Sequence, residues 1–376
     1  MTRKAAERRA AGLEVLDLSA GQPDFPSPAV AVESARRALG EGFTHYTVAA
    51  GLPDLRAALA ERYRGRDGAP WDGADVLVTV GAKAALMQTM LIALDEGDSA
   101  VYPTPAWVSF AEQIRFAGAR TLPVPMAAED GFTIHPEPLI EALEDTTRLV
   151  LLNSPSNPTG GILDADGLRR LVTACAERGV LVVADETYEA FVYDGRRHAS
   201  AAALAREFPD TVAVISSFSK TYSMTGWRVG WLAGPRALID RVSALQGHTT
   251  SNVTSFAMRG ALAALEGADE LVRLQVDEMA RRRARVVEAL AGLRGVSCPS
   301  PAGAFYVFPE VTELLGGDVP GSLELAEVLL ETTGVALVPG VAFEREGHLR
   351  LSFAGAPEVL DAALERLGGF FARRNV

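Results

Sequence analysis

Lysine is scarce in this chain of 376 residues. Of its 36 basic residues only Lys4, Lys83 and Lys220 are lysine, and the other 33 are arginine. A guanidinium keeps its proton and cannot form an imine, whereas a lysine ammonium can lose its proton and attack a carbonyl. Lys83 and Lys220 lie inside unusual local motifs and are therefore candidates for chemistry, while Lys4 fits chance in an arginine-biased composition.

Cysteine and long apolar runs are also lacking. Cys175 and Cys298 lie far apart, and we expect two reduced, buried thiols, which fits a cytoplasmic protein. No uninterrupted apolar run approaches the ~18 residues of a membrane span, and Met1–Gly12 is a charged helical pattern without an apolar signal core. We therefore expect neither membrane association nor a targeting segment.

Basic charge is in deficit, with 36 basic against 48 acidic residues and a net charge of −12. The longest basic run, Arg281–Arg283, lies in a polar helical pattern that is typical of a solvated face. Nucleic acid is therefore excluded as a partner, and we also expect no metal site.

The pattern between about residues 30 and 285 alternates short apolar runs with helical periodicity, which predicts an α/β fold. Several of the runs are too continuously apolar for a strand with one wet face, so we expect a buried, mainly parallel sheet of seven strands flanked by helices. The predicted strands are Val76–Val80, Ala100–Tyr102, Arg120–Val124, Leu149–Leu152, Leu181–Ala184, Val212–Ile215 and Val229–Ala233.

A chain of this length is longer than one hydrophobic core usually organises, so we expect two domains. They are a large domain of residues 30–288 and a small α+β domain of residues 1–29 and 289–376. The predicted helices of the large domain are Ala82–Leu94, Trp107–Ala117, Ala165–Arg178 and a long connector, Ala268–Leu293. In the small domain we expect strands Phe305–Phe308, Val335–Val338 and Leu349–Phe353 and a closing helix Glu358–Arg373.

Polar residues follow several predicted strands, at the sheet edge where α/β proteins bind ligands. In Ser216–Gly230, Lys220 lies among hydroxyls and eight residues before Arg228, and these donors suit a phosphate monoester; a turn with solvated charges is the alternative. Asp185 ends a strongly apolar run, where a buried carboxylate needs a cationic partner such as a protonated pyridine; a helix N-cap is equally compatible. The turn Gly81–Lys83 joins a strand to a helix whose free N–H groups suit an anion, although such turns are common.

Seven segments taken together resemble the class I aminotransferases of pyridoxal-5′-phosphate (PLP) fold type I, nearly end to end. They are Leu18–Phe25, Tyr46 with Ala50–Pro53, Asn153–Gly160, Asp185–Tyr188, Ser216–Lys220, Gly226–Gly230 and His348–Phe353. The resemblance implies a PLP enzyme that moves an amino group between an L-amino acid and a 2-oxo acid, and a homodimer.

The resemblance also implies roles for individual residues. Lys220 resembles the Schiff-base lysine, which also transfers the proton. Asp185 resembles the partner of the pyridinium nitrogen, and Tyr188 with Asn157 resembles the pair that hydrogen-bonds the phenolic oxygen.

The cofactor phosphate, in the same resemblance, is held by Ser217, Ser219, Arg228 and the backbone at Ala82, with Tyr46 reaching across from a neighbouring subunit. Trp107 resembles the aromatic residue that stacks on the cofactor ring, and a core tryptophan is the alternative.

Substrate would be held by Arg350, which resembles the arginine that clamps the α-carboxylate, with help from Asn157 and Gly21. An arginine on an edge strand is the alternative for Arg350. Lys83 resembles the lysine with which the aspartate and prephenate aminotransferase subgroup binds a side-chain carboxylate, which favours acidic substrates; otherwise it balances charge beside the phosphate.

Other functions stay open. Family members carry roughly one more helix ahead of Met1–Gly12, which leaves room for a specialised biosynthetic role on an unusual amino acid. A related fold type I lyase or decarboxylase would also keep Lys220 and Asp185. A cofactor-sensing transcription regulator is disfavoured by the acidic charge and by a family pattern that starts about twenty residues into the chain.

Overall fold

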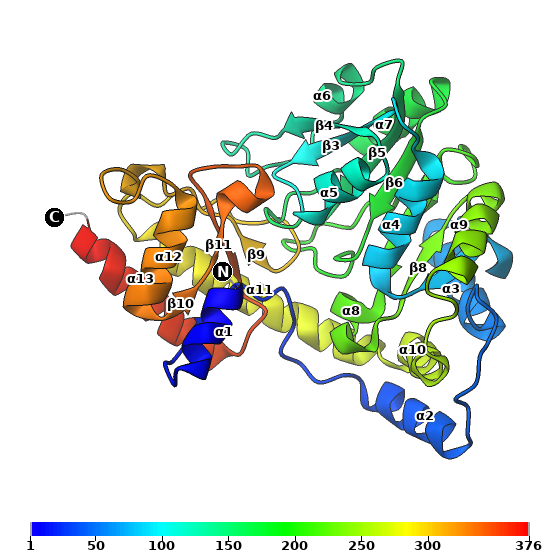
Figure 1. Cartoon of the computed structure of the whole chain (residues 1–376), viewed down its shortest axis with the longest axis horizontal. Helices are drawn as coiled ribbons and strands as arrows, with labels where there is room; N and C mark the ends of the chain where they lie inside the picture. Colours follow the sequence, from blue (N-terminus) through cyan, green and yellow to red (C-terminus); the bar gives the residue numbers. More distant parts are fainter. Residues whose placement is uncertain (1, 375–376) are drawn as a thin grey trace.

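A seven-stranded sheet forms the centre of the larger part of the molecule (Figure 1). The structure is a computed structural model that describes residues 2–374. In spatial order the strands are β2 (Val76–Thr79), β8 (Gly230–Ala233), β7 (Val212–Ser217), β6 (Leu181–Asp185), β5 (Thr147–Asn153), β3 (Ser99–Thr104) and β4 (Arg120–Pro125). β8 is antiparallel to both of its neighbours, and the other neighbouring pairs are parallel. The prediction of a mainly parallel seven-stranded sheet is confirmed.

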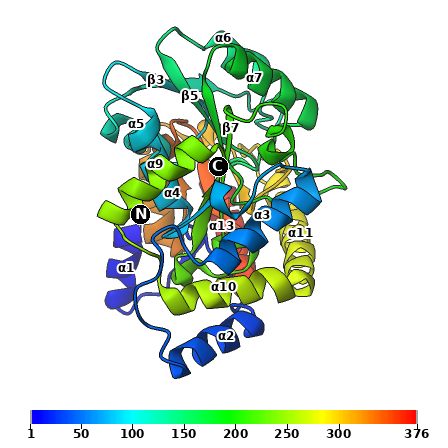
Figure 2. The ribbon, with the colours of Figure 1, turned by 90° about the vertical axis from the view of Figure 1, so that its right-hand side faces the viewer.

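Helices cover both faces of this sheet, which explains why its strands lack apolar–polar alternation. Along β5, Val150 and Leu152 join the apolar cluster of one face, and Leu149 and Leu151 join that of the other. The first face is covered by α3 (Pro53–Asp67), α7 (Ala165–Glu177) and α10 (Ser255–Gly267). The second is covered by α4 (Gly81–Ala93), α5 (Ser109–Phe116) and α9 (Arg236–His248). Figure 2 shows α10 lying beside α2 (Ala29–Gly40). A further short helix, α6, spans Pro136–Glu141.

The smaller part of the molecule holds two small sheets. β12 (Leu349–Ser352) lies between β11 (Val338–Pro339) and β9 (Tyr306–Val307), and β1 (Leu16–Asp17) pairs in parallel with β10 (Val335–Ala336). The predicted single strand Val335–Val338 is therefore wrong, because the chain changes sheets at Leu337. Around these strands lie α1 (Thr2–Ala10), α12 (Ser322–Thr333) and α13 (Pro357–Arg374).

The long helix α11 (Asp269–Ala291) runs between the two parts (Figure 1). Its residues Met279, Val286 and Leu290 belong to the apolar cluster of the smaller part, which is separate from the two clusters of the sheet. This separation favours the predicted domains, 30–288 and 1–29 with 289–376, whose boundaries stay a prediction.

Two expectations about individual side chains are wrong. Arg282 and Arg283 are buried rather than solvated, because α11 is enclosed there: Arg282 pairs with Asp24 and Arg283 with Asp194. Cys298 is only partly buried, whereas Cys175 is buried as expected, and both are free thiols. Within residues 2–374, no helix combines the length and the apolar composition that crossing a membrane requires.

Candidate active site

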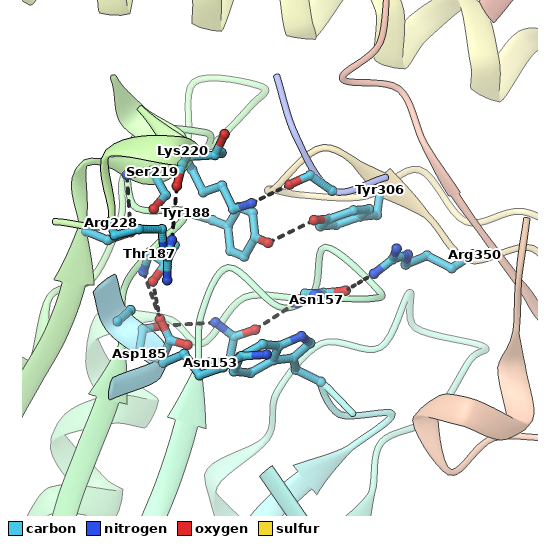
Figure 3. A pocket seen from close by; sticks show the side chains of 16 residues that line it. Asn153, Asn157, Asp185, Thr187, Tyr188, Ser219, Lys220, Arg228, Tyr306 and Arg350 are labelled. Carbon is cyan, nitrogen blue, oxygen red and sulfur yellow. Dashed lines mark hydrogen bonds between the residues drawn. The ribbon is translucent and has the colours of Figure 1, made fainter. Parts of the chain in front are cut away.

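A cavity of about 390 Å³ lies where the ends of β5, β6 and β7 meet the small sheet that carries β9 and β12 (Figure 3). Its lining residues are Gly21, Ala82, Lys83, Trp107, Asn153, Asn157, Asp185, Thr187, Tyr188, Ser217, Ser219, Lys220, Thr225, Arg228, Tyr306 and Arg350. The structure thus brings together the predicted site residues other than Tyr46. Tyr46 lies outside this lining and is 90% exposed.

Lys220 lies on the short helix α8 (Phe218–Thr221), which follows β7 directly. The hydroxyl of Ser217 caps this helix by accepting from the backbone N–H of Ser219, and Lys220 Nζ donates to the carbonyl of Gly21. Burial lowers the pKa of Lys220 to about 8, and the positive charges of Arg350 and Arg228 act in the same direction. About a tenth of this amine is therefore neutral and nucleophilic at pH 7, far more than for an ordinary lysine.

Asp185 ends β6 and is buried. Its Oδ1 accepts hydrogen bonds from the hydroxyl of Thr187 at 2.6 Å and from the backbone N–H of Thr187 at 3.1 Å. Burial raises the pKa of Asp185 to about 6, against the opposing effect of the Thr187 hydrogen bonds. Residues 187–190 form turns, so the helix N-cap alternative for Asp185 is wrong.

Two asparagines connect Asp185 to Arg350. Asn153 Nδ2 donates to the carbonyl of Asp185 at 3.0 Å, and its Oδ1 accepts from the N–H of Asn157 at 2.8 Å. Asn157 Oδ1 in turn accepts from Arg350 Nη1 at 3.0 Å. The end of the large sheet and the small sheet are thereby joined through side chains that line one cavity.

Arg350 lies on the central strand of its sheet, so the edge-strand alternative is wrong. It is buried, and its Nη2 donates to the carbonyl of Ser19 at 2.6 Å. Its Nε is buried without a partner. A buried guanidinium with an unused donor can bind an anionic group that enters the cavity.

At the end of the cavity away from Arg350, neighbouring groups lie very close to the backbone of two glycines. Gly81 has φ of 74°, and a Cβ there would lie 2.5 Å from Arg228 Nη2. A Cβ on Gly230 would lie 2.6 Å from the N of Ala82. Glycine at both positions leaves Arg228 beside the N-terminus of α4, whose N–H groups and dipole favour an anion.

Lys83 and Trp107 form a further wall. Lys83 Nζ lies 4.7 Å from the centroid of the Trp107 ring, within range of a cation–π contact. Trp107 precedes α5 rather than beginning it, is only partly buried and lines the cavity, so it is not an enclosed core tryptophan.

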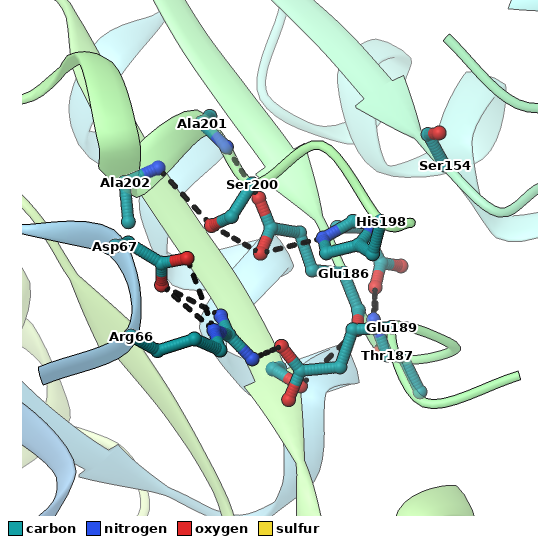
Figure 4. A network of polar contacts seen from close by, with 12 residues as sticks. Arg66, Asp67, Ser154, Glu186, Thr187, Glu189, His198, Ser200, Ala201 and Ala202 are labelled. Atoms are coloured by element: carbon teal, nitrogen blue, oxygen red, sulfur yellow. Dashed lines mark hydrogen bonds and ion pairs between the residues drawn. The ribbon is translucent and has the colours of Figure 1, made fainter. Parts of the chain in front are cut away.

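A buried ion-pair network lies next to the Asp185–Tyr188 turn (Figure 4). Glu186 Oε2 lies 3.0 Å from His198 Nε2, and the two Glu189 oxygens accept from Arg62 at 2.9 Å and Arg66 at 2.7 Å. Burial alone would raise the pKa of Glu189, but the two arginines lower it to about 2. Glu186, Glu189 and His198 are close enough to share a metal ion, but arginine already neutralises Glu189, so we assign the network to holding the turn.

The family model for aminotransferases of class I and II matches residues 14–367. The chain belongs to this family. An aspartate aminotransferase of Geobacillus stearothermophilus is 40% identical over 100% of this chain and 95% of that protein. An aspartate/prephenate aminotransferase of Cereibacter sphaeroides is 37% identical over 99% of this chain and 95% of that protein. The structure of Thermus thermophilus aspartate aminotransferase with maleate matches with a TM-score of 0.92 and 37% identity over 98% and 94% of the two chains.

Membership of this aminotransferase family confirms fold type I and a PLP-dependent aminotransferase. The cavity fits PLP, because the side chains that line it include four cations, Lys83, Lys220, Arg228 and Arg350, but only one carboxylate, Asp185. Its volume lies within the roughly 300–1,000 Å³ of small-molecule sites. The sequence did not identify Asn153, Thr187, Thr225 and Tyr306 as lining residues, although the first three lie in segments that it singled out.

Proposed function

We propose that this aminotransferase acts on acidic amino acids of the aspartate and glutamate kind and their 2-oxo acids. The observation that carries the proposal is the presence of Lys83 in a cavity that already holds Arg228 for a phosphate and Arg350 for an α-carboxylate. With Lys220 reserved for the cofactor aldehyde, Lys83 is a third cation, and it suits a second carboxylate on the substrate. The aspartate and aspartate/prephenate aminotransferases among the relatives support acidic substrates over an unusual amino acid, and support amino transfer over a lyase or decarboxylase.

For the cofactor, we propose that the phosphate is held by Ser217, Ser219, Arg228 and the N–H of Ala82. Lys220 would bond to the reactive carbon, and Asp185 would pair with the pyridine nitrogen. Tyr188 and Asn157 would donate to the phenolic oxygen. Trp107 would stack on the face of the ring. When bound, PLP supplies an electron sink for the negative charge that develops at the substrate α-carbon.

The chain's own groups then bind the substrate and move a proton. Arg350 offers its guanidinium to the α-carboxylate, and Asn157 and the backbone at Gly21 lie beside it. Once the substrate has displaced it from the cofactor, the Lys220 amine can move a proton from the substrate α-carbon to the cofactor carbon that it had held, because its lowered pKa lies close to physiological pH. The carboxylate of Asp185, which is ionised above its pKa of about 6, stabilises positive charge on its partner.

We further propose that the protein is a cytoplasmic homodimer in which the partner's Tyr46 completes the phosphate site. Tyr46 is 90% exposed and nearby Val48 is 58% exposed, and Arg228 also lies at the surface. A partner subunit that covers these residues would bury apolar area and enclose Arg228.

The pKa of Lys220 predicts how cofactor uptake depends on pH. Only the neutral amine attacks an aldehyde, and it predominates above a pKa of about 8. Uptake of PLP by the apoenzyme should therefore accelerate roughly fivefold between pH 7 and pH 8 and level off above about pH 9. Stopped-flow absorbance would measure this, and a rate that rises steeply up to about pH 10.5, as for an ordinary lysine, would contradict the burial of this amine.

Replacing Lys83 by alanine tests the acidic substrate. We expect KM for aspartate and glutamate to rise roughly 10- to 100-fold, the effect of one charge-assisted contact, while KM for alanine changes little. Steady-state kinetics with the three donors would show the difference. Equal changes in KM for all three donors would instead assign Lys83 to balancing charge near the phosphate. Lys4→Ala is the control, because it removes a partly exposed lysine that pairs with Glu327.

A further inference from the structure

Tyr306 lines the cavity, although it lies in none of the motifs that the sequence analysis singled out. It is 1% exposed and begins β9, opposite Ser352 of β12, the strand that also carries Arg350. Its hydroxyl lies 2.8 Å from the hydroxyl of Tyr188, and its ring centroid lies 4.5 Å from Cζ of Arg350 (Figure 3). Tyr306 thus contacts both Tyr188, which is proposed to bind the cofactor, and Arg350, which is proposed to bind the substrate.

The Tyr306 hydroxyl lies so close to Gly21 that there is no room for a side chain at position 21. A Cβ at position 21 would overlap the Tyr306 hydroxyl, so any larger residue would displace the ring. The carbonyl of Gly21 accepts from Lys220. The position of the Tyr306 hydroxyl is therefore tied to the segment that also holds the reactive amine.

The chemistry of two neighbouring phenols sets a direction for their hydrogen bond. Burial raises the pKa of Tyr188 well above its usual value, and burial also raises that of Tyr306, so both hydroxyls stay protonated at neutral pH. Each phenol has a single proton to donate. If Tyr188 donates its proton to a cofactor oxygen, Tyr306 must donate to Tyr188, which strengthens Tyr188 as a donor.

The face of the same ring holds Arg350. Cζ of the guanidinium lies 4.5 Å from the centroid of the Tyr306 ring and 5.0 Å from that of the Phe343 ring. Such contacts orient a planar cation without using its N–H donors, which remain available for Asn157, Ser19 and an incoming carboxylate.

We infer that Tyr306 is a positioning residue that acts in two separable ways: its hydroxyl orients Tyr188 toward the cofactor's phenolic oxygen, and its ring orients Arg350 toward the substrate carboxylate. This inference rests on the proposed function, because it assigns Tyr188 and Arg350 the roles given there. It predicts that the two effects can be removed one at a time.

Two variants of the PLP-loaded enzyme test this. In Tyr306→Phe, the pH at which half of the visible absorption band of the bound cofactor has changed should rise by roughly half a unit to one unit. A shift of this size is the effect of one lost neutral hydrogen bond. The Kd for maleate, a dicarboxylate without an amino group, should stay unchanged. In Tyr306→Leu, the Kd for maleate should also rise about three- to tenfold, as expected for a lost cation–π contact.

Tyr193→Phe is the matched control, because it removes a buried hydroxyl that donates to the Ala304 carbonyl at 2.6 Å, outside the cavity lining. An unshifted midpoint in Tyr306→Phe, or an equal shift in Tyr193→Phe, would overturn the inference. An unchanged Kd for maleate in Tyr306→Leu would overturn it as well, and if Tyr306→Leu does not fold, the same Kd is measured in Tyr306→Met. A wild-type enzyme that shows no visible band with PLP would instead refute the proposed function.

Discussion

In the Lys220→Ala variant, the PLP-loaded protein is expected to lose the absorption band of the imine and to lose amino transfer by roughly 10⁴-fold or more. The physical reason is that no other side chain of the cavity offers an amine beside Gly21 and Asp185, since Lys83 lies on the Trp107 wall. Arginine cannot substitute, because a guanidinium keeps its proton. Absorbance spectra and steady-state rates measure the two losses.

Lys4→Ala provides the control for this variant. Lys4 pairs with Glu327 at the surface of the smaller part, and its loss should leave both spectrum and rate unchanged. PLP should still bind Lys220→Ala without covalent attachment, because the proposed phosphate contacts of Ser217, Ser219 and Arg228 are unchanged. A Lys220→Ala enzyme that kept the imine band and the rate of the wild type would contradict the proposed mechanism.

Arg350→Lys is expected to lower kcat/KM roughly 10²- to 10³-fold while leaving the protein yellow. Lysine keeps the positive charge but cannot at once bond Asn157, Ser19 and a carboxylate in one plane. The buried site therefore loses its fixed geometry for the substrate. Half-reaction spectra with aspartate would report the loss separately from cofactor binding.

Arg148→Lys is a suitable comparison for Arg350→Lys, since Arg148 is a surface arginine that pairs with Asp98. Its kcat/KM should match that of the wild type. A normal kcat/KM in Arg350→Lys would show that the α-carboxylate binds elsewhere in the cavity.

The sequence predicted those parts of the molecule in which local pattern and tertiary environment agree. Strands β5, β6 and β7 are continuously apolar because both faces are covered, and polar motifs directly follow them. Lys220, Asp185 and Asn157 were therefore found from their places after strands and from the family resemblance. Their roles stay predictions until variants are measured.

The errors arose where contacts between distant segments override local pattern. Arg282 and Arg283 read as solvated because their partners, Asp24 and Asp194, lie far away in the sequence. Tyr306 reads as an ordinary strand residue, and only the pairing of β9 with β12 places it against Arg350. The division of residues 335–338 between two sheets likewise depends on partners that a local pattern does not contain.

The proposed roles of the other cavity residues all depend on the amine of Lys220 holding the cofactor. Borohydride reduction of the PLP-loaded protein, followed by peptide mass mapping, tests it most directly, because the chain has only three lysines to distinguish. One equivalent of reduced cofactor is expected on the peptide that contains Lys220. Label on Lys83 or Lys4, or an unlabelled Lys220, would contradict it.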